Sequence, residues 1–206
     1  MKMSEMPTPT GEQSTLWALR ALLHGRALQQ HMGTVYRPDD TLVKLGIASD
    51  EMDDEDDPRA VRGLVSKRLA ALEAGRVDRE ADVFVNAARL GRALALTSVE
   101  QDLLALACLI PVDDALETCV MAAFQAAQRS FRAACRLLGD LLGASAEDVV
   151  AALRAQGVLL RCGLLALRPR DIAANTCPLQ APDLVADALH APARDGDEVV
   201  ERLAPT

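Results

Sequence analysis

The sequence predicts a mainly α fold that carries one small β-hairpin near its C-terminal end. Half of the 206 residues are apolar but only 2% are aromatic, so leucine, valine and alanine must build the core. Leucine and alanine are good helix formers, and apolar residues recur at helical spacing along most of the chain. We therefore expect a helical N-terminal part and a C-terminal part that share one core.

The chain begins with a polar stretch, residues 1–13, that we expect to be a loose tail. Ser14 or Thr15 can cap the first helix, whose apolar residues continue at helical spacing. This helix is expected to end near His31.

Residues 34–57 show no sustained period and end in the acidic run 50–57. Such a run repels itself and predicts a solvated loop. It lacks the alternating ligands and the glycine of a calcium loop. The next helix is expected to start at Pro58 and to end at Gly75, and Asp78 is expected to cap the one after it.

Thr97 and Glu100 form a capping box, in which each side chain can bond to the backbone N–H of the other residue. The helix behind it, residues 99–110, is apolar almost all round, which predicts a place at the centre of the core. Asp113 or Asp114 is expected to start the following helix.

Residues 130–168 predict two helices and a tight hairpin. Ser130 opens the first helix, residues 143–145 make a short turn, and the second helix spans residues 146–156. Helix, turn, helix and hairpin are the outline of a winged helix, which usually binds nucleic acid or protein. The hairpin strands are expected in two apolar runs on either side of Cys162-Gly163, residues 158–160 and 164–167.

Short helices are also expected at residues 182–189 and near the C-terminal end. Together these patterns divide the chain into four segments. The segments are a tail at 1–13, a helical part at 14–96 with the acidic loop 50–57, a winged-helix-like domain at 97–172, and a linker with short helices at 173–206.

Charge leaves two kinds of partner open for the winged-helix-like domain. The whole chain has a net charge of -8, which disfavours non-specific binding to nucleic acid, but residues 128–170 hold seven arginines against three acids, a net charge of +4. The expected second helix carries Glu147 and Asp148 in its first turn, where they would repel phosphate. Four residues on this helix and the hairpin are our candidate partner contacts: Glu147, Arg154, Arg161 and Arg168, with Arg161 at the hairpin tip.

No motif for catalysis or for a cofactor occurs in the sequence. A phosphate loop, a dinucleotide fingerprint and the common hydrolase motifs are all missing. His24 and His31 lie two helical turns apart, too far to share one metal without further ligands. We therefore predict a chain that is not an enzyme, with no catalytic, cofactor-binding or metal-binding residues.

The five cysteines are odd in number and none has Cys-x-x-Cys spacing, which favours reduced thiols in a cytoplasmic protein. No apolar run approaches the roughly 20 residues of a membrane span, and no secretion signal is visible at the N-terminus. We expect a cytoplasmic protein that does not contact a membrane.

Two stretches together resemble the N-terminal region of bacterial AAA+ ATPases. The first is Leu96-Thr97-Ser98-Val99-Glu100-Gln101-Asp102 with the apolar helix behind it, and the second runs from Val149 through Gly157 to Leu165. The tail, at 181–189 and 200–203, is similar to the linker before the ATPase module, so the resemblance covers residues 90–206. Walker motifs are absent, so no nucleotide-binding residue is carried over.

The resemblance implies a regulatory adaptor region that recognises a partner or substrate for a hexameric motor. The chain would then be either the part that precedes an ATPase module or a free-standing relative of that part. The alternative, supported by the arginines of residues 128–170, is a winged-helix transcriptional regulator that binds DNA.

Overall fold

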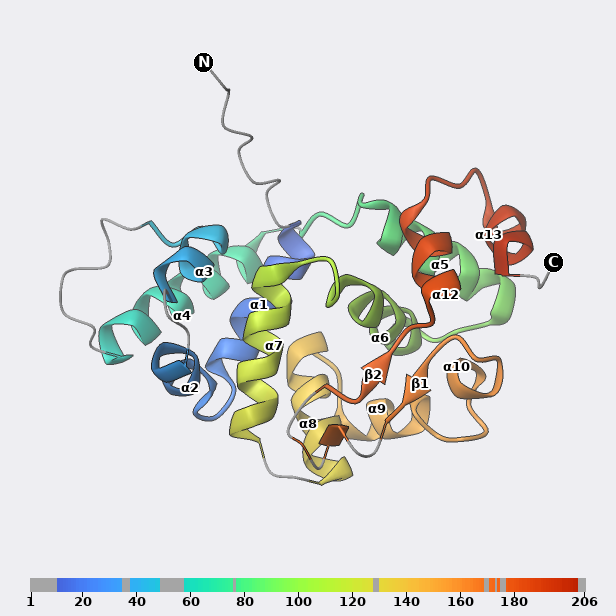
Figure 1. Cartoon of the computed structure of the whole chain (residues 1–206). Helices are drawn as coiled ribbons and strands as arrows, with labels where there is room; N and C mark the ends of the chain where they lie inside the picture. The colour runs from blue at the N-terminus through green and yellow to red at the C-terminus, as the bar shows by residue number, and fades with distance from the viewer. Residues whose placement is uncertain are drawn as a thin grey trace, which may run out of the picture.

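The structure is a computed structural model that describes residues 11–34, 38–48, 58–75, 77–127, 130–168, 171–172, 174 and 177–203. These residues are mainly helical and contain one antiparallel sheet of two short strands, which confirms the expected fold class (Figure 1). Buried leucine, valine and alanine side chains from both halves of the chain form one connected hydrophobic cluster.

The first expected helix is divided into two. α1 spans Glu12–Leu23 and α2 spans Ala27–Thr34. Between them Gly25 has a φ of 54°, a left-handed conformation in which glycine is not strained, and the chain turns there. The prediction of one helix was wrong because the apolar spacing continues across this turn.

Ser14 or Thr15 was expected to cap this helix, and that prediction was wrong. Both lie inside α1 and are buried, and Gly11 is the N-cap. The Ser14 hydroxyl donates instead to the carboxylate of Asp113 at the start of a distant helix, with 2.5 Å between the oxygens.

α3 spans Pro38–Lys44 and α4 spans Pro58–Ala74. The start of α4 at Pro58 and its end before Gly75 confirm the prediction. α3 was not expected, because a helix of two turns has too few apolar positions for a period to show. The acidic run 50–57 lies outside the described residues.

α5 spans Asp82–Leu94 and α6 spans Ser98–Leu109. The expectation that Asp78 caps α5 was wrong: Ala81 is the N-cap, and the Asp78 carboxylate accepts from the N–H of Glu80 at 2.8 Å.

The capping box before α6 is present as predicted. The Thr97 hydroxyl oxygen accepts from the Glu100 N–H at 3.2 Å, and the Glu100 carboxylate accepts from the Thr97 N–H at 2.8 Å. Leu103, Leu104 and Leu106 of α6 are fully buried, so this helix lies at the centre of the core.

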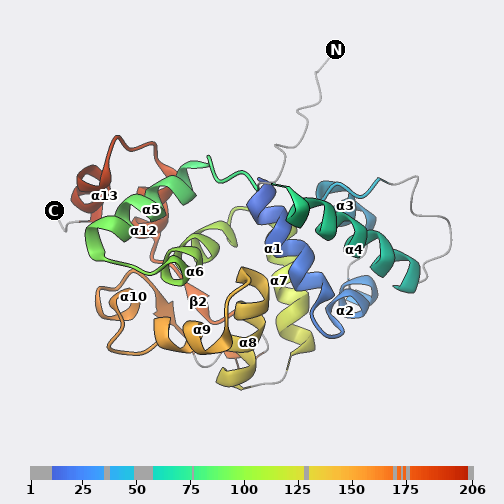
Figure 2. The same cartoon turned by 180° about the vertical axis from the view of Figure 1, so that it is seen from behind.

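α7 spans Asp114–Ala126, is capped by the Asp113 carboxylate, and packs along α1 and α2 (Figure 1). Seen from behind, α1 lies between α4 and α8, Phe131–Leu142 (Figure 2). Arg20 of α1 joins the two sides, since its guanidinium forms an ion pair with Glu73 of α4 at 2.9 Å and donates to the Leu141 carbonyl at 3.1 Å.

The predicted hairpin exists, but its strands lie elsewhere. The run 158–160 belongs to α10, Val158–Arg161, a single helical turn. β1, Ala166–Leu167, pairs with β2, Leu179–Gln180, across a connection of 11 residues, 168–178. The pairing of 158–160 with 164–167 was therefore wrong, and only the second run supplies a strand.

Two further helices follow the sheet, as expected for the C-terminal segment. α12 spans Asp183–His190 and α13 spans Gly196–Leu203, and both pack against α5. The Asn86 side chain of α5 donates to the Leu189 carbonyl at 3.0 Å and to the Ala191 carbonyl at 2.9 Å. These helices are thus part of the packed fold.

Candidate interaction surface

Local signals fix where α8 begins and ends. α8 spans Phe131–Leu142, and the Ser130 hydroxyl at its start accepts from the N–H of Ala133 at 3.2 Å. Gly143 ends the helix in the left-handed conformation, with φ at 71°. These signals confirm the predicted start of α8 and the predicted turn after it.

α9 spans Ala146–Ala152 and is shorter than the predicted 146–156. The Ser145 hydroxyl accepts from the Asp148 N–H at 3.1 Å and donates to the Asp148 carboxylate at 2.7 Å. Val149, Ala152 and Leu153 are buried, so they fix the inward side of the helix. The remaining side chains of this short helix form its outward side.

The outward side of α9 is chemically mixed. Glu147, Asp148 and Ala151 are exposed on the helix, and Arg154, Ala155 and Gln156 are exposed directly after it. Two acids, two alanines, an arginine and a glutamine are thus exposed on α9 and directly after it. We call these side chains, together with α8 and α10, the α8–α10 face.

The four predicted contact residues are all exposed, and they come from successive elements. Glu147 lies in the first turn of α9 and Arg154 follows this helix. Arg161 is the last residue of α10, so its expected place at a hairpin tip was wrong. Arg168 follows β1, and its backbone N–H extends the ladder to the Pro178 carbonyl at 2.9 Å.

The side chains of these four residues form no ion pair or hydrogen bond with the described part of the chain. The same holds for Arg132 and Arg136 on α8, which were counted in the charge of the segment but not selected as contacts. The signal that could have found them is their i, i+4 spacing after the Ser130 cap.

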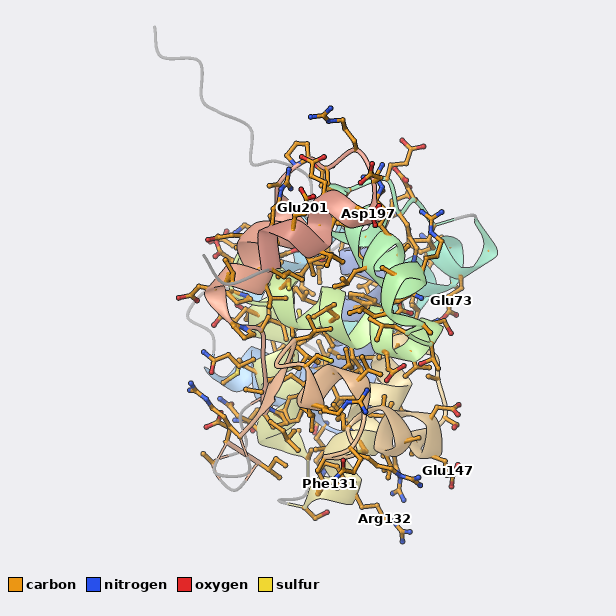
Figure 3. The ribbon with its side chains drawn as sticks, turned by 90° about the vertical axis from the view of Figure 1, so that its right-hand side faces the viewer. Glu73, Phe131, Arg132, Glu147, Asp197 and Glu201 are labelled. Carbon is orange, nitrogen blue, oxygen red and sulfur yellow. The ribbon has the colours of Figure 1, made fainter. Side chains whose placement is uncertain are left out.

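Side chains from the starts of α8 and α9 lie at the end of the molecule that is opposite to α13 (Figure 3). Phe131, Arg132 and Glu147 lie together at one end, and the side chain of Arg132 points away from the body (Figure 3). Asp197 and Glu201 of α13 lie at the other end (Figure 3). Phe131, at the start of α8, is an exposed aromatic side chain, with 38% of its surface accessible.

Three of the five cysteines are buried, and two histidines contact polar groups of the chain. Cys108, Cys119 and Cys135 are buried, and burial raises the pKa of the Cys108 and Cys135 thiols to about 12 and about 11. His24 pairs with Asp140 at 2.9 Å, and the His190 ring nitrogen lies 3.1 Å from the Cys108 carbonyl oxygen.

Within the described ranges, no three His, Cys, Asp or Glu side chains are placed so that they could hold a metal ion. Over the same residues, no helix combines the length and the apolar character that crossing a bilayer requires.

The comparisons with known proteins identify no relative. No family model matches the chain, and neither the curated proteins nor the solved structures contain a match.

Proposed function

We propose that this chain is a non-catalytic interaction module whose α8–α10 face recognises a partner protein. The observation that carries the proposal is the mixed set of exposed side chains on α9 and directly after it, which combines acids, small apolar groups and an arginine: Glu147, Asp148 and Ala151 on the helix, and Arg154 and Ala155 after it. Protein interfaces combine apolar contact with polar groups and are enriched in arginine. Glu147 and Asp148 in the first turn of α9 would repel the phosphates of DNA, which favours a protein over DNA as the partner.

The resemblance to the region before an AAA+ ATPase module extends this proposal. The partner would then be a substrate or adaptor that the module presents to the motor. This extension rests on the two leucine-rich motifs and the C-terminal segment. The five cysteines are free thiols in the structure, and we propose a cytoplasmic location in keeping with them.

Photo-crosslinking from the middle of the α8–α10 face tests the proposal. A photoreactive amino acid replaces Ala151 in the full chain, and Ala60 is replaced as control, because it is also exposed but lies on α4 (Figure 1). We expect a discrete protein adduct from position 151 in the source cell and none from position 60. Equal adducts from both positions, or none from 151, would contradict the proposal.

A charge-reversal pair sharpens this test. Arg154→Glu with Arg161→Glu is expected to reduce the adduct from position 151. The matched control is Arg26→Glu with Arg62→Glu, since these arginines are also exposed and form no ion pair with the described residues. An equal loss with both pairs would show that net charge, and not this face, determines binding.

One observation favours DNA binding as a second candidate: five arginines of residues 130–168 are exposed without a carboxylate partner in the described part of the chain. A DNA contact through them would weaken steeply between about 50 and 200 mM salt. Anisotropy of a labelled random duplex measures this directly. Retention at low salt that Arg154→Glu with Arg161→Glu removes would support DNA binding, and no retention would reject it.

A further inference from the structure

A small cavity lies between α5 and the beginning of α6, on elements that do not form the α8–α10 face. Its volume is about 310 Å³. The residues that determine its chemistry are Arg79, Phe84, Ala88, Arg92, Gln101 and Asp102. Ligand pockets have volumes of roughly 300 to 1,000 Å³, so this cavity has room for one small group.

One wall of the cavity is a fixed, charge-neutral pair. The Arg79 guanidinium donates to the Asp102 carboxylate at 2.8 Å and to the Gln13 side-chain oxygen at 2.9 Å, and its Cζ lies 5.5 Å from the centre of the Phe84 ring. Burial raises the pKa of the Asp102 carboxyl, while the neighbouring Arg79 opposes this rise. Arg79 and Asp102 therefore leave little net charge between them.

A second part of the lining depends on the close approach of α5 and α6. A Cβ on Gly91 would lie 2.4 Å from the side-chain nitrogen of Gln101, so glycine is what lets α6 come this near. That nitrogen donates to the Leu96 carbonyl at 3.0 Å, which fixes the Gln101 side chain. The cavity thus has walls that are in place before any ligand arrives.

The remaining charge belongs to Arg92. Its side chain is exposed, and it forms no ion pair or hydrogen bond with the described residues. The lining therefore has a net charge of about +1 in a chain of net charge -8. A lone guanidinium above apolar side chains favours an anion with an apolar body, because arginine binds carboxylates through two parallel hydrogen bonds.

We infer that this cavity binds one carboxylate attached to a short apolar group. The carboxylate pairs with Arg92, and the apolar group contacts Phe84, Ala87 and Ala88. Arg92 is the one arginine of the lining without a carboxylate partner among the described residues, so the lining neutralises a single negative charge, which favours a monoanion. The same chemistry is offered by a free small carboxylate and by an acidic residue next to an apolar one in a peptide.

NMR titration of the full chain with defined probes tests this inference. The charged probe is 3-phenylpropionate, the uncharged probe of the same shape is 3-phenylpropanol, acetate supplies the charge alone, and acetyl-Leu-Glu-amide represents a peptide. We expect saturable shifts of the Ala87, Ala88 and Gln101 amide signals with 3-phenylpropionate or with the peptide. Whichever of these two binds more tightly identifies the source of the ligand.

Two variants and one control complete the test. Arg92→Ala is expected to weaken binding about fivefold, as for an exposed charge pair, and Ala88→Trp to abolish it by filling the cavity. Arg26→Ala is the control and should leave binding unchanged. Absence of saturable shifts with every probe, equal binding of 3-phenylpropanol, or an unchanged affinity in Arg92→Ala would each overturn the inference.

Discussion

The turn between α8 and α9 depends on the missing side chain of Gly139. A Cβ at this position would lie 2.8 Å from the Ala144 carbonyl oxygen and 3.4 Å from the Ala146 nitrogen, both of which are backbone atoms. Backbone cannot rotate away, so Gly139→Ala must push the start of α9 outwards. Overpacking of this kind costs about 1 to 3 kcal/mol.

Gly63 of α4 provides a matched control. It is also inside a helix, but a Cβ there would meet nothing within 4 Å. Replacing a helical glycine by alanine stabilises the folded state by about 0.5 to 1 kcal/mol, and this gain applies at both positions. The difference between the two variants therefore isolates the contact with the turn.

We expect Gly63→Ala to raise the free energy of unfolding by about 0.5 to 1 kcal/mol and Gly139→Ala to lower it, with a difference of about 1 to 3 kcal/mol. Urea unfolding measures both, with far-ultraviolet circular dichroism for the helices and the fluorescence of Trp17, the only tryptophan and a fully buried one. Equal stabilisation by the two substitutions would refute the close approach of α9 to α8.

Three further predictions concern the core and the thiols. Leu104→Ala and Leu106→Ala should each lower the free energy of unfolding by about 2 to 5 kcal/mol in urea melts, because both side chains are fully buried; no change would mean that α6 is not central. Thr97→Ala should cost about 1 kcal/mol in the same assay through the lost capping bond, and a cost equal to that of Leu104→Ala would contradict this origin. Under native conditions Cys162, which is exposed, should react with a thiol reagent much faster than the buried cysteines, and Cys162→Ser should remove the fast phase.

The parts of the fold that local signals determine could be predicted from the sequence. The Thr97 box, the Ser130 cap and Asp113 each act within four residues, so their helices begin where expected. The break at Gly25 was missed because Leu23 and Ala27 keep the four-residue spacing of a helix across it, and a glycine is tolerated in many helices.

The position of the sheet could not be predicted in the same way. A run of three apolar residues such as 158–160 suits a strand and a helical turn equally, and here it forms α10. β1 finds its partner in Leu179–Gln180, beyond a connection of 11 residues, and nothing local to either strand indicates that pairing. Arg161 was misplaced for this reason.

The candidate contact residues and the cavity also differ in whether local sequence signals could predict them. Exposure of Glu147 follows from helical spacing against the buried Val149, so the sequence was sufficient there, whereas Arg154 is exposed after the end of α9, inside the range where the helix was expected to continue. The cavity beside Arg92 was not foreseen, because it depends on the distance between α5 and α6, which is set by Gly91 and the Gln101 side chain.

The most direct test of the central claim is digestion of the adduct that forms from position 151. If the α8–α10 face binds a protein, nuclease will leave the added mass unchanged and mass spectrometry of the adduct will give partner peptides. An adduct that nuclease removes would contradict the account and assign this face to nucleic acid.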